Sequence, residues 1–342
     1  MKKILINIIC VVMAVLFLAF LQQLFMPKYM SSIYEGNLVE EYYKSNKDHD
    51  VIFVGDCEVF SNVSPVTLWE KYGITSYIRG SAQQLVWQSY YLLEEMLEYE
   101  KPDVVVFNVL AMKYNEPQKE AYNRLTLDGM KLSKSKIGAI QASMLEEENL
   151  ITYLFPLLRY HSRWSELSWE DFRYLFNKEN VSHNGYLMRS DTKPVGAVPD
   201  GRKLPDYSFG ENGIELMLIK SPSVYPYWYE EWDEQIVEYA KENGLQYVNF
   251  LPLAEEMNID YSRDTYDGGL HMNLAGAEKF TEYLGGILKE TYTLEDRRGD
   301  AKVAAEWQDK TEFYHWMEQD QAMEMEKYGY LKSYGAAAQT LD

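Results

Sequence analysis

Short apolar runs alternate along the chain with longer segments of helical periodicity. The runs are rich in Val, Ile and Phe, as are the buried strands of parallel sheets. They predict strands at Val51–Val54, Ile74–Ile78, Val104–Asn108, Leu216–Ile219 and Tyr247–Phe250. The intervening segments predict helices over Pro65–Tyr72, Val86–Glu100, Tyr229–Asn243 and Leu274–Lys289. This alternation predicts an α/β fold: a three-layer sandwich around a parallel, doubly wound sheet.

The alternation is interrupted between about residues 113 and 210. Helices are expected here over Lys119–Leu127, Ala139–Leu145, Ile151–Tyr160 and Trp169–Phe176. A stretch rich in Gly, Pro and Asp follows, from Asn184 to Pro205. We interpret the segment as one large, mostly helical insertion over the carboxyl edge of the sheet, acting as a lid or a substrate platform. An independent helical domain is the alternative.

The amino-terminal segment predicts a transmembrane helix. From Ile4 to Phe20 the chain is almost unbroken in apolar residues and carries no charge, which is enough to cross a bilayer. Lys2 and Lys3 favour a cytoplasmic N-terminus. A cleaved signal peptide is the alternative, but the apolar run is long and no convincing small-x-small site follows it. We therefore expect residues 1–27 to be a single-pass anchor in the cell membrane, with the C-terminal domain extracytoplasmic.

The remaining domain boundaries follow from composition. Residues 28–48 are polar and Tyr-rich and are expected to form a stalk. Residues 49–294 make up the α/β domain with its insertion. Residues 295–342 form a charged helical extension, with one helix over about Ala301–Tyr330. We expect this helix to pack on the domain, a partner-binding appendage being the alternative.

The net charge of the chain makes some classes of binding partner improbable. The chain has 342 residues and a formal net charge of −20. This balance argues against a nucleic-acid partner and predicts repulsion from anionic lipid surfaces. The 29 Tyr and 8 Trp are typical of sugar-facing or membrane-proximal surfaces, and equally of ordinary aromatic cores.

Metal and disulfide chemistry find little support in the sequence. Only two cysteines occur, Cys10 in the apolar segment and Cys57, and we do not expect them to pair. The histidines outside the motifs discussed below show no spacing typical of metal ligands; they are His49, His161, His183 and His315. No metal and no cofactor are predicted.

Cys57 occupies a position where α/β sheets commonly place reactive groups. Gly55 ends the first apolar run, and Asp56 and Cys57 follow in the turn. Ligands and catalytic groups gather in the loops after the carboxyl ends of parallel strands. A nucleophile in this turn would be exposed beside the amino end of the next helix. An inert buried thiol is the more common fate of a free cysteine.

Four short motifs at strand ends point to one family. Val-Gly-Asp-Cys57 follows the first strand, Arg79-Gly80-Ser81 follows the second, Asn108 ends the third, and Asp267-Gly-Gly-Leu-His271 precedes the last helix. In order and position they resemble the four blocks of the SGNH, or GDSL-type, hydrolases, with Cys57 where that superfamily normally has serine. Apart from the insertion, the resemblance covers about residues 49–292. It implies a flavodoxin-like sheet.

The resemblance also implies roles for these residues. Cys57 would be the nucleophile, His271 the general base, and Asp267 the acid that orients the imidazole. The backbone N–H groups of Cys57 and Gly80 and the amide of Asn108 would form the oxyanion hole. A nearby imidazolium and a helix N-terminus are expected to lower the pKa of the Cys57 thiol.

Two departures from the family pattern leave alternatives open. The acid usually lies three residues before the histidine, where this chain has Gly268. Either the loop has one extra residue and Asp267 is the partner of His271, or Asp264 is. Asn108 is followed by Val-Leu-Ala and not by the acidic residue usual in that block.

With its membrane anchor and large insertion, the chain resembles the cell-envelope branch of the superfamily. That branch includes the D-alanyl transfer protein of teichoic acid modification, DltD, and the alginate-type O-acetyltransferases. The resemblance implies an extracytoplasmic acyltransferase or esterase that acts on an envelope polysaccharide or a teichoic-acid-like polymer. It also implies a polytopic membrane O-acyltransferase as a partner. The acidic body favours a neutral glycan over a polyanion. A simple esterase or thioesterase, and an inactive glycan-binding or scaffold protein of an envelope complex, are the competing hypotheses.

Two further groups have more than one interpretation. Arg159, His161 and Arg163 could hold an anionic or sugar group, although such a run is more often the polar side of a helix. The aromatic residues Trp228, Tyr229 and Trp232 could line a cleft or simply pack.

Overall fold

A computed structural model describes residues 2–27, 38–114, 116–176, 182–195, 215–225 and 227–332. In these residues five strands form one parallel sheet, in the order β2-β1-β3-β4-β5. The strands are β1 (Val51–Gly55), β2 (Ser76–Gly80), β3 (Val104–Asn108), β4 (Glu215–Lys220) and β5 (Gln246–Asn249). This is the doubly wound, flavodoxin-like order, so the predicted fold class is confirmed.

The sheet register brings the strand-end motifs to one edge. Gly55 at the end of β1 lies opposite Gly80 at the end of β2. On the other side of β1, Val54 pairs with Phe107, the residue before Asn108. The strand order reverses between β1 and β3, and such switch points are where open α/β sheets bind ligands.

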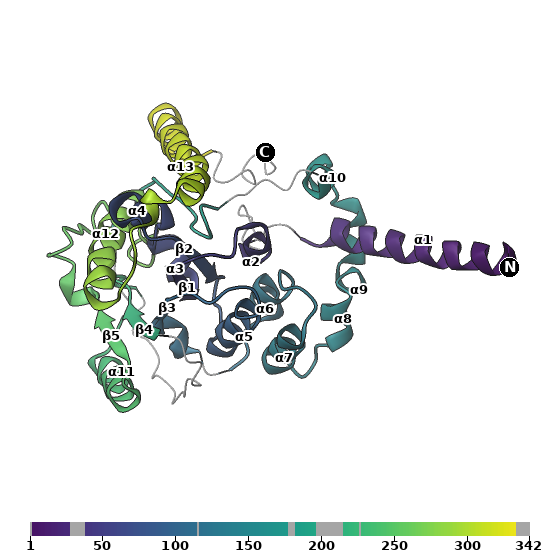
Figure 1. Cartoon of the computed structure of the whole chain (residues 1–342), viewed down its shortest axis with the longest axis horizontal. Coiled ribbons are helices and arrows are strands. Elements are labelled where there is room, and N and C mark those ends of the chain that lie inside the picture. The colour runs from purple at the N-terminus through teal and green to yellow at the C-terminus, as the bar shows by residue number, and fades with distance from the viewer. Residues whose placement is uncertain are drawn as a thin grey trace.

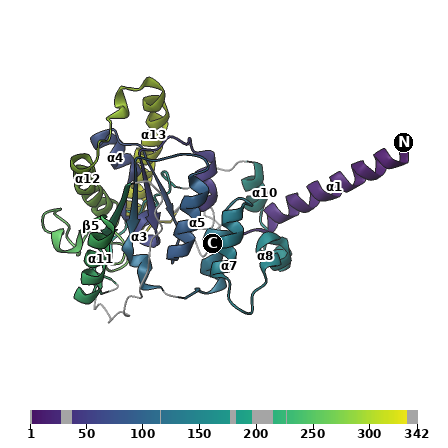
Figure 2. The ribbon, with the colours of Figure 1, turned by 60° about the horizontal axis from the view of Figure 1, so that its bottom comes forward.

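Helices cover both faces of the sheet (Figures 1 and 2). Val51 and Phe53 of β1 point to one core, and Ile52 and Val54 point to the other. The first core is closed by α3 (Cys57–Asn62), α4 (Pro65–Tyr72), α12 (Leu274–Thr291) and α13 (Ala301–Tyr328). The second core is closed by α5 (Val86–Met96), the 3₁₀ turn η3 (Val109–Lys113) and α11 (Glu230–Asn243). Two further 3₁₀ turns are η5 (Leu251–Leu253) and η6 (Arg297–Gly299).

The insertion forms a side layer on α5. Its elements are α6 (Glu120–Leu127), α7 (Lys134–Ser143), α8 (Leu150–Leu154), α9 (Leu157–Tyr160), η4 (His161–Ser165) and α10 (Trp169–Phe176). Leu92 of α5 is buried in a separate small core with Leu127, Ile140 and Tyr153 of the insertion. Residues 189–195 instead lie against the loop that carries His271, through bonds such as Leu274 N to the Arg189 carbonyl. Residues 196–214 lie outside the described residues.

The single helix predicted over Ile151–Tyr160 is wrong. It is divided into α8 and α9, because Pro156 has no N–H to continue the helical ladder and the preceding residue Phe155 leaves the helical region, with ψ 76°.

Both ends of the body are packed against the α/β domain. Residues 28–37 lie outside the described residues, but Leu38 and Tyr42, in α2 (Leu38–Glu41) and the turn η2 (Tyr42–Lys44), are buried beside β2. At the other end, Trp307 of α13 stacks on Trp69 of α4 with ring centroids 5.2 Å apart. Tyr314 of α13 is also fully buried.

The helix α1 (Lys2–Phe25) projects from the body as a single long rod (Figure 1). Every residue from Lys2 to Phe20 is exposed, and only Leu24 is buried. Within the described residues it is the one helix long and apolar enough to cross a membrane. Its composition fits a membrane anchor or a signal sequence.

Trp307 should be the main attachment of α13. Replacing the buried Trp307 with alanine empties a large space between α13 and α4, and we expect a loss of about 3–5 kcal/mol in the free energy of unfolding. Urea denaturation of the full chain in detergent measures it. Trp316→Ala on the same helix is the control, because that side chain is 58% exposed and should cost less than about 1 kcal/mol. Equal effects of the two substitutions would contradict the packing role of Trp307.

Candidate active site

Cys57 begins a short helix of its own immediately after β1. The side chain of Asp56 caps this helix, α3, by accepting a hydrogen bond from the Glu58 backbone N–H at 3.2 Å. Cys57 is the first residue of α3 and its side chain is half-buried. The sequence placed Cys57 in a turn, because α3 is only six residues long and leaves no periodic signal.

His271 is held by Asp267. The imidazole Nδ1 lies 2.5 Å from Oδ2 of Asp267, and the backbone N–H of His271 donates to Oδ1 of the same carboxylate at 2.9 Å. The alternative acid, Asp264, accepts from Lys279 Nζ at 2.5 Å and from the backbone N–H of Asp260 at 2.7 Å. In this structure Asp267 is therefore the carboxylate that orients the ring.

Two glycines explain the four-residue spacing between the acid and the base. Gly268 and Gly269 have φ of +88° and +107°, a region that other residues rarely adopt. They fold the loop so that the carboxylate of Asp267 reaches both the backbone and the ring of His271. The one extra residue relative to the family pattern is thus absorbed in a tight turn.

Cys57 faces the other nitrogen of the imidazole. Since Asp267 occupies Nδ1, Nε2 is the nitrogen left for Cys57, and it is buried with no hydrogen-bond partner in the described residues. A side-chain hydrogen bond between Cys57 and His271 contributes to the pKa shifts of both groups, so the two side chains are neighbours. Nucleophile–base hydrogen bonds are often long without substrate and tighten when it binds.

The ionisation of this pair is strongly coupled. Burial raises the pKa of the Cys57 thiol, and the charge of Asp56 adds to the effect, while His271 opposes it. Burial disfavours the charged imidazole, but Cys57 and Asp267 outweigh it and raise the pKa of His271 to about 10. The contribution of Cys57 exists only once the sulfur is a thiolate. The raised pKa holds the sulfur as a thiol, and proton transfer from sulfur to nitrogen is stabilised by the attraction between the two charges that it creates.

Gly80 lies against the turn that carries the nucleophile. A Cβ at Gly80 would come within 2.5 Å of a methyl group of Val59 and within 3.3 Å of the Asp56 carbonyl oxygen. Only glycine allows the end of β2 to approach α3 this closely. The preceding Arg79 points away into the body, where it is fully buried and lies 3.2 Å from Glu95.

Asn108 is near the nucleophile helix, but its amide is already engaged. Its Nδ2 donates to Oε2 of Glu58 at 2.7 Å and to Oγ of Ser221 at 2.9 Å. Its Oδ1 accepts from the backbone N–H of Leu110 at 3.1 Å. In this arrangement Asn108 has no amide hydrogen left for an oxyanion, so it connects β3, α3 and the end of β4.

A buried ion pair that the sequence analysis did not find lies directly behind Cys57. Lys220 Nζ is 3.2 Å from Oε1 of Glu58, and neither side chain has any exposed surface. Lys220 also donates to the backbone carbonyl of Ser221 at 2.7 Å. A signal was available: a lysine directly follows the apolar run Leu216–Ile219, at the edge where the other motifs meet.

The helix α3 also positions the histidine loop. Oδ1 of Asn62, its last residue, accepts from the backbone N–H of Met272 at 2.8 Å. The hydroxyl of Ser61 lies 3.2 Å from that of Tyr266. The ring of Tyr266 stacks on the imidazole of His271, with centroids 5.5 Å apart and planes 14° from parallel. One short helix thus carries Cys57 at one end and holds the loop of His271 at the other.

Asp56 places a second carboxyl group beside the site. It is fully buried, and its Oδ2 has no hydrogen-bond partner in the described residues. Burial raises the pKa of Asp56 to about 6, although the positive charge of Lys113 opposes the shift. Tyr114, the residue after Lys113, interacts with both Asp56 and Cys57. The residues at the end of η3 therefore belong to the same group of interacting ionisable side chains as Asp56 and Cys57.

The other candidates from the sequence lie elsewhere. Arg159 pairs with Glu120 at 2.8 Å, and Arg163 pairs with Asp171 at 3.3 Å. Trp228 and Trp232 are buried and pack edge-to-face in the second core. Across the described part of the chain, no group of three or more His, Cys, Asp or Glu is placed to hold a metal.

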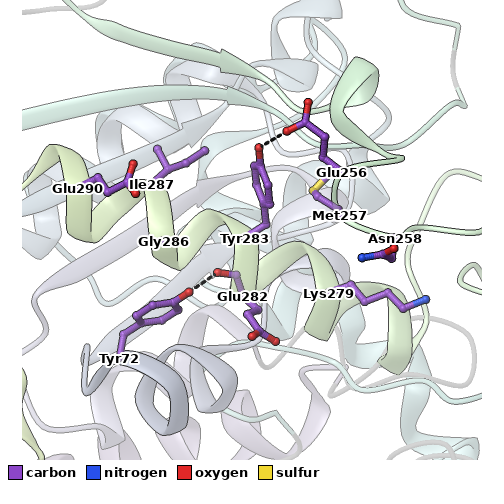
Figure 3. A pocket seen from close by; sticks show the side chains of 10 residues that line it. All are labelled: Tyr72, Glu256, Met257, Asn258, Lys279, Glu282, Tyr283, Gly286, Ile287 and Glu290. Atoms are coloured by element: carbon purple, nitrogen blue, oxygen red, sulfur yellow. Dashed lines mark hydrogen bonds between the residues drawn. The ribbon is translucent and has the colours of Figure 1, made fainter.

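A pocket of about 610 Å³ lies on the outer side of α12, and it is separate from Cys57 and His271 (Figure 3). Tyr283 donates to Glu256 across it at 2.8 Å, and Tyr72 donates to the Glu282 backbone carbonyl at 2.8 Å. Neither Cys57 nor His271 is among its lining residues.

Comparison with known proteins gives distant structural neighbours only. No protein-family model matches the chain, and no curated protein matches it. One similar solved structure is described as a lipolytic protein of the G-D-S-L family from Desulfitobacterium hafniense; it is 15% identical, covers 70% of this chain and 100% of its own, and has a TM-score of 0.33. Another, described as an acylhydrolase from Bacteroides fragilis, is 11% identical, covers 77% of this chain and 99% of its own, and has a TM-score of 0.35. At these TM-scores neither supports an argument about activity, so any assignment of function depends on the geometry of the site.

The buried pair behind Cys57 should be sensitive to the loss of either charge. Lys220→Met leaves Glu58 charged and unpaired in the core, and we expect a loss of about 3–5 kcal/mol in the free energy of unfolding. Glu58→Gln combined with Lys220→Met should recover most of this loss. Lys279→Met, which breaks the partly exposed pair with Asp264, is the control and should cost less. Urea denaturation measures all three, and a double variant as unstable as Lys220→Met would contradict the pairing of these two charges.

The ionised carboxylate of Asp56 should destabilise the folded chain when the pH is above the pKa of this group. Its pKa is about 6 in the folded chain and near 3.8 unfolded, so the folded state binds the proton more tightly. The contribution of Asp56 to stability is therefore lost as pH rises from about 4 to about 6. Asp56→Asn keeps the helix cap and removes the charge.

We expect Asp56→Asn to match the unchanged chain at pH 4 and to be more stable by about 3 kcal/mol at pH 7.5. Urea denaturation at the two pH values provides the measurement. A difference that does not depend on pH, or a less stable variant at pH 7.5, would show that the Asp56 carboxylate is not strained by burial.

Proposed function

We propose that this chain is an SGNH-type acyltransferase or esterase that works through Cys57, His271 and Asp267. The observation that supports the proposal is the state of the imidazole. Asp267 holds Nδ1 at 2.5 Å, and Nε2 is buried, has no other partner among the described residues and is left facing Cys57. Asp267, His271 and Cys57 are thus related as acid, base and nucleophile are in a catalytic triad.

In the first half-reaction, the sulfur of Cys57 attacks the carbonyl carbon of an acyl donor. The thiol proton passes to Nε2 of His271, and the imidazolium is stabilised by Asp267. The raised pKa of the thiol makes this transfer necessary, because little thiolate is present at neutral pH. Collapse of the tetrahedral intermediate breaks the donor's ester bond, and His271 returns the proton to the leaving oxygen. The product is a thioester on Cys57.

The oxyanion of that intermediate needs donors near the carboxyl edge of the sheet. The backbone N–H groups of Cys57 and Gly80 are the proposed donors, since α3 and the end of β2 lie in close contact. Asn108 takes a supporting role, with both amide hydrogens bound to Glu58 and Ser221. It holds the nucleophile helix against β3.

In the second half-reaction, a hydroxyl group attacks the thioester. His271 accepts the proton of the hydroxyl, the carbon–sulfur bond breaks, and the sulfur recovers the proton from the imidazolium. A sugar or polyol hydroxyl gives acyl transfer, and water gives hydrolysis. We place the reaction outside the cytoplasm, on a cell-envelope polysaccharide or a teichoic-acid-like polymer, with α1 as the anchor and Lys2 and Lys3 on the cytoplasmic side. A polytopic membrane O-acyltransferase that supplies the acyl group is the proposed partner.

A second candidate is a catalytically silent SGNH-fold protein that binds glycan or serves as a scaffold. Two observations favour it: burial raises the pKa of the Cys57 thiol, and the Asn108 amide is engaged. Such a protein would keep the fold and the arrangement of residues at the strand ends without turnover.

The two candidates differ in whether Cys57 accepts an acyl group. We expect the full chain in detergent to form an acetyl thioester on Cys57 when it is incubated with p-nitrophenyl acetate, as detected by mass spectrometry. His271→Gln should slow acylation by about 100-fold or more, because the thiol loses its base. Asp267→Asn should also slow it, whereas Asp264→Asn should have little effect.

Iodoacetamide labelling of Cys57 above pH 10 is the control. At high pH a larger share of the thiol ionises without help from His271, so the difference in labelling rate between His271→Gln and the unchanged chain should shrink. If both chains label with iodoacetamide but neither is acylated above the background seen with Cys57→Ala, the silent candidate is correct. Competition between a sugar acceptor and water for the thioester then separates transferase from esterase.

A further inference from the structure

The helices of the insertion nearest α1 expose an unusual set of large apolar side chains. Trp164 is 73% exposed, Trp169 77% and Phe176 82%, and the neighbouring helix turns expose others in the same way. We call the set the aromatic collar: Phe155, Leu158, Trp164, Trp169 and Phe176. None of these side chains is explained by the core or by the candidate active site.

The elements that carry the collar lie beside the point where α1 joins the body. The helices α8, α9 and α10 lie on the side from which α1 projects (Figures 1 and 2). Arg163 donates to the backbone carbonyl of Phe25 at the end of α1, at 2.6 Å. The same guanidinium pairs with Asp171 of α10 at 3.3 Å, and Gln22 of α1 donates to the Leu154 carbonyl at 3.5 Å. These bonds fix the collar relative to the axis of α1.

The length of α1 brings the collar to the membrane surface. The exposed apolar part of α1, residues 4–20, is about 26 Å long at 1.5 Å per residue. The hydrocarbon core of a bilayer is about 30 Å thick. If α1 spans it, the bilayer must reach the last turn of α1, where the helix already contacts the body. The side chains beside that turn then lie at the depth of the lipid headgroups.

We propose that the aromatic collar is a second membrane contact, which inserts into the headgroup region of the outer leaflet around α1. The inference rests on the proposed role of α1 as an uncleaved anchor. Trp is the residue that favours this depth, because its ring is apolar and its N–H is polar. The net charge of −20 disfavours anionic lipid, so the contact is apolar and suits zwitterionic lipid. It holds the body in one orientation on the membrane.

Fluorescence quenching by brominated lipid tests the proposal. The full chain is reconstituted in phosphatidylcholine vesicles whose acyl chains carry bromine near the headgroup. α1 contains no Trp, so the emission reports only on the body. We expect about a quarter of the emission to be quenched, since two of the eight tryptophans belong to the collar. About 1 M salt should not change it, because the contact is not ionic.

The Trp164→Phe, Trp169→Phe double variant should lose this quenching and keep the fold. Trp316→Phe is the matched control, because Trp316 is 58% exposed on α13, away from α1 (Figure 1). Quenching that is absent from the unchanged chain, or that survives in the double variant, would overturn the collar proposal and leave the face to a protein partner.

Retention of the protein in the vesicles after an alkaline carbonate wash tests the anchor separately. A chain that resists the wash but shows no collar quenching is anchored by α1 alone, and the collar proposal fails. A chain that is washed out yet shows quenching beforehand refutes the anchor, and the collar around an anchored α1 falls with it.

Discussion

The buried carboxylate of Glu58 determines how the strand ends behind Cys57 are joined. Glu58 directly follows Cys57, and its side chain points into the body and not to solvent. A buried charge of this kind is tolerated only when it is paired and its remaining oxygen is hydrogen-bonded. Lys220 supplies the opposite charge and Asn108 supplies the hydrogen bond. Meeting that one requirement joins α3, β3 and β4 at the carboxyl edge of the sheet.

This constraint decides what Asn108 can do. A free side-chain amide at the end of β3 could serve a developing oxyanion. The Glu58 carboxylate at 2.7 Å is a stronger acceptor than a neutral carbonyl, and it takes one amide hydrogen while Ser221 takes the other. The Asn108 amide is therefore not available to an oxyanion, and its hydrogen bonds instead hold α3 rigidly against β3 and the end of β4. Because α3 also bonds the loop of His271 through Asn62, the same attachment fixes the base relative to the sulfur.

Sequence alone could predict most of the fold, since the strands are continuous apolar runs and the longer helices are periodic. The boundaries of α4 and α10 agree to the residue, because Ser64 caps one with Pro65 at its first position and aromatic periodicity marks the other. The short helix α3 and the break at Pro156 were missed, since six residues or one proline carry little periodic signal. The Glu58–Lys220 pair could not be predicted, because it joins residues 162 positions apart and depends on the sheet order.

The surroundings of Cys57 favour a thiol and not a preformed thiolate. Asp56 lies beside Cys57 with an unpartnered oxygen, and its negative charge opposes a second one on the sulfur. The helix end and His271 favour the thiolate, yet burial and Asp56 prevail, so the pKa of the thiol rises. In the proposed reaction the sulfur therefore gives its proton to His271 during attack, as a serine hydroxyl does. Sulfur then adds one advantage to that reaction, because a thioester is a more activated acyl carrier than an ester and so favours transfer to a hydroxyl group.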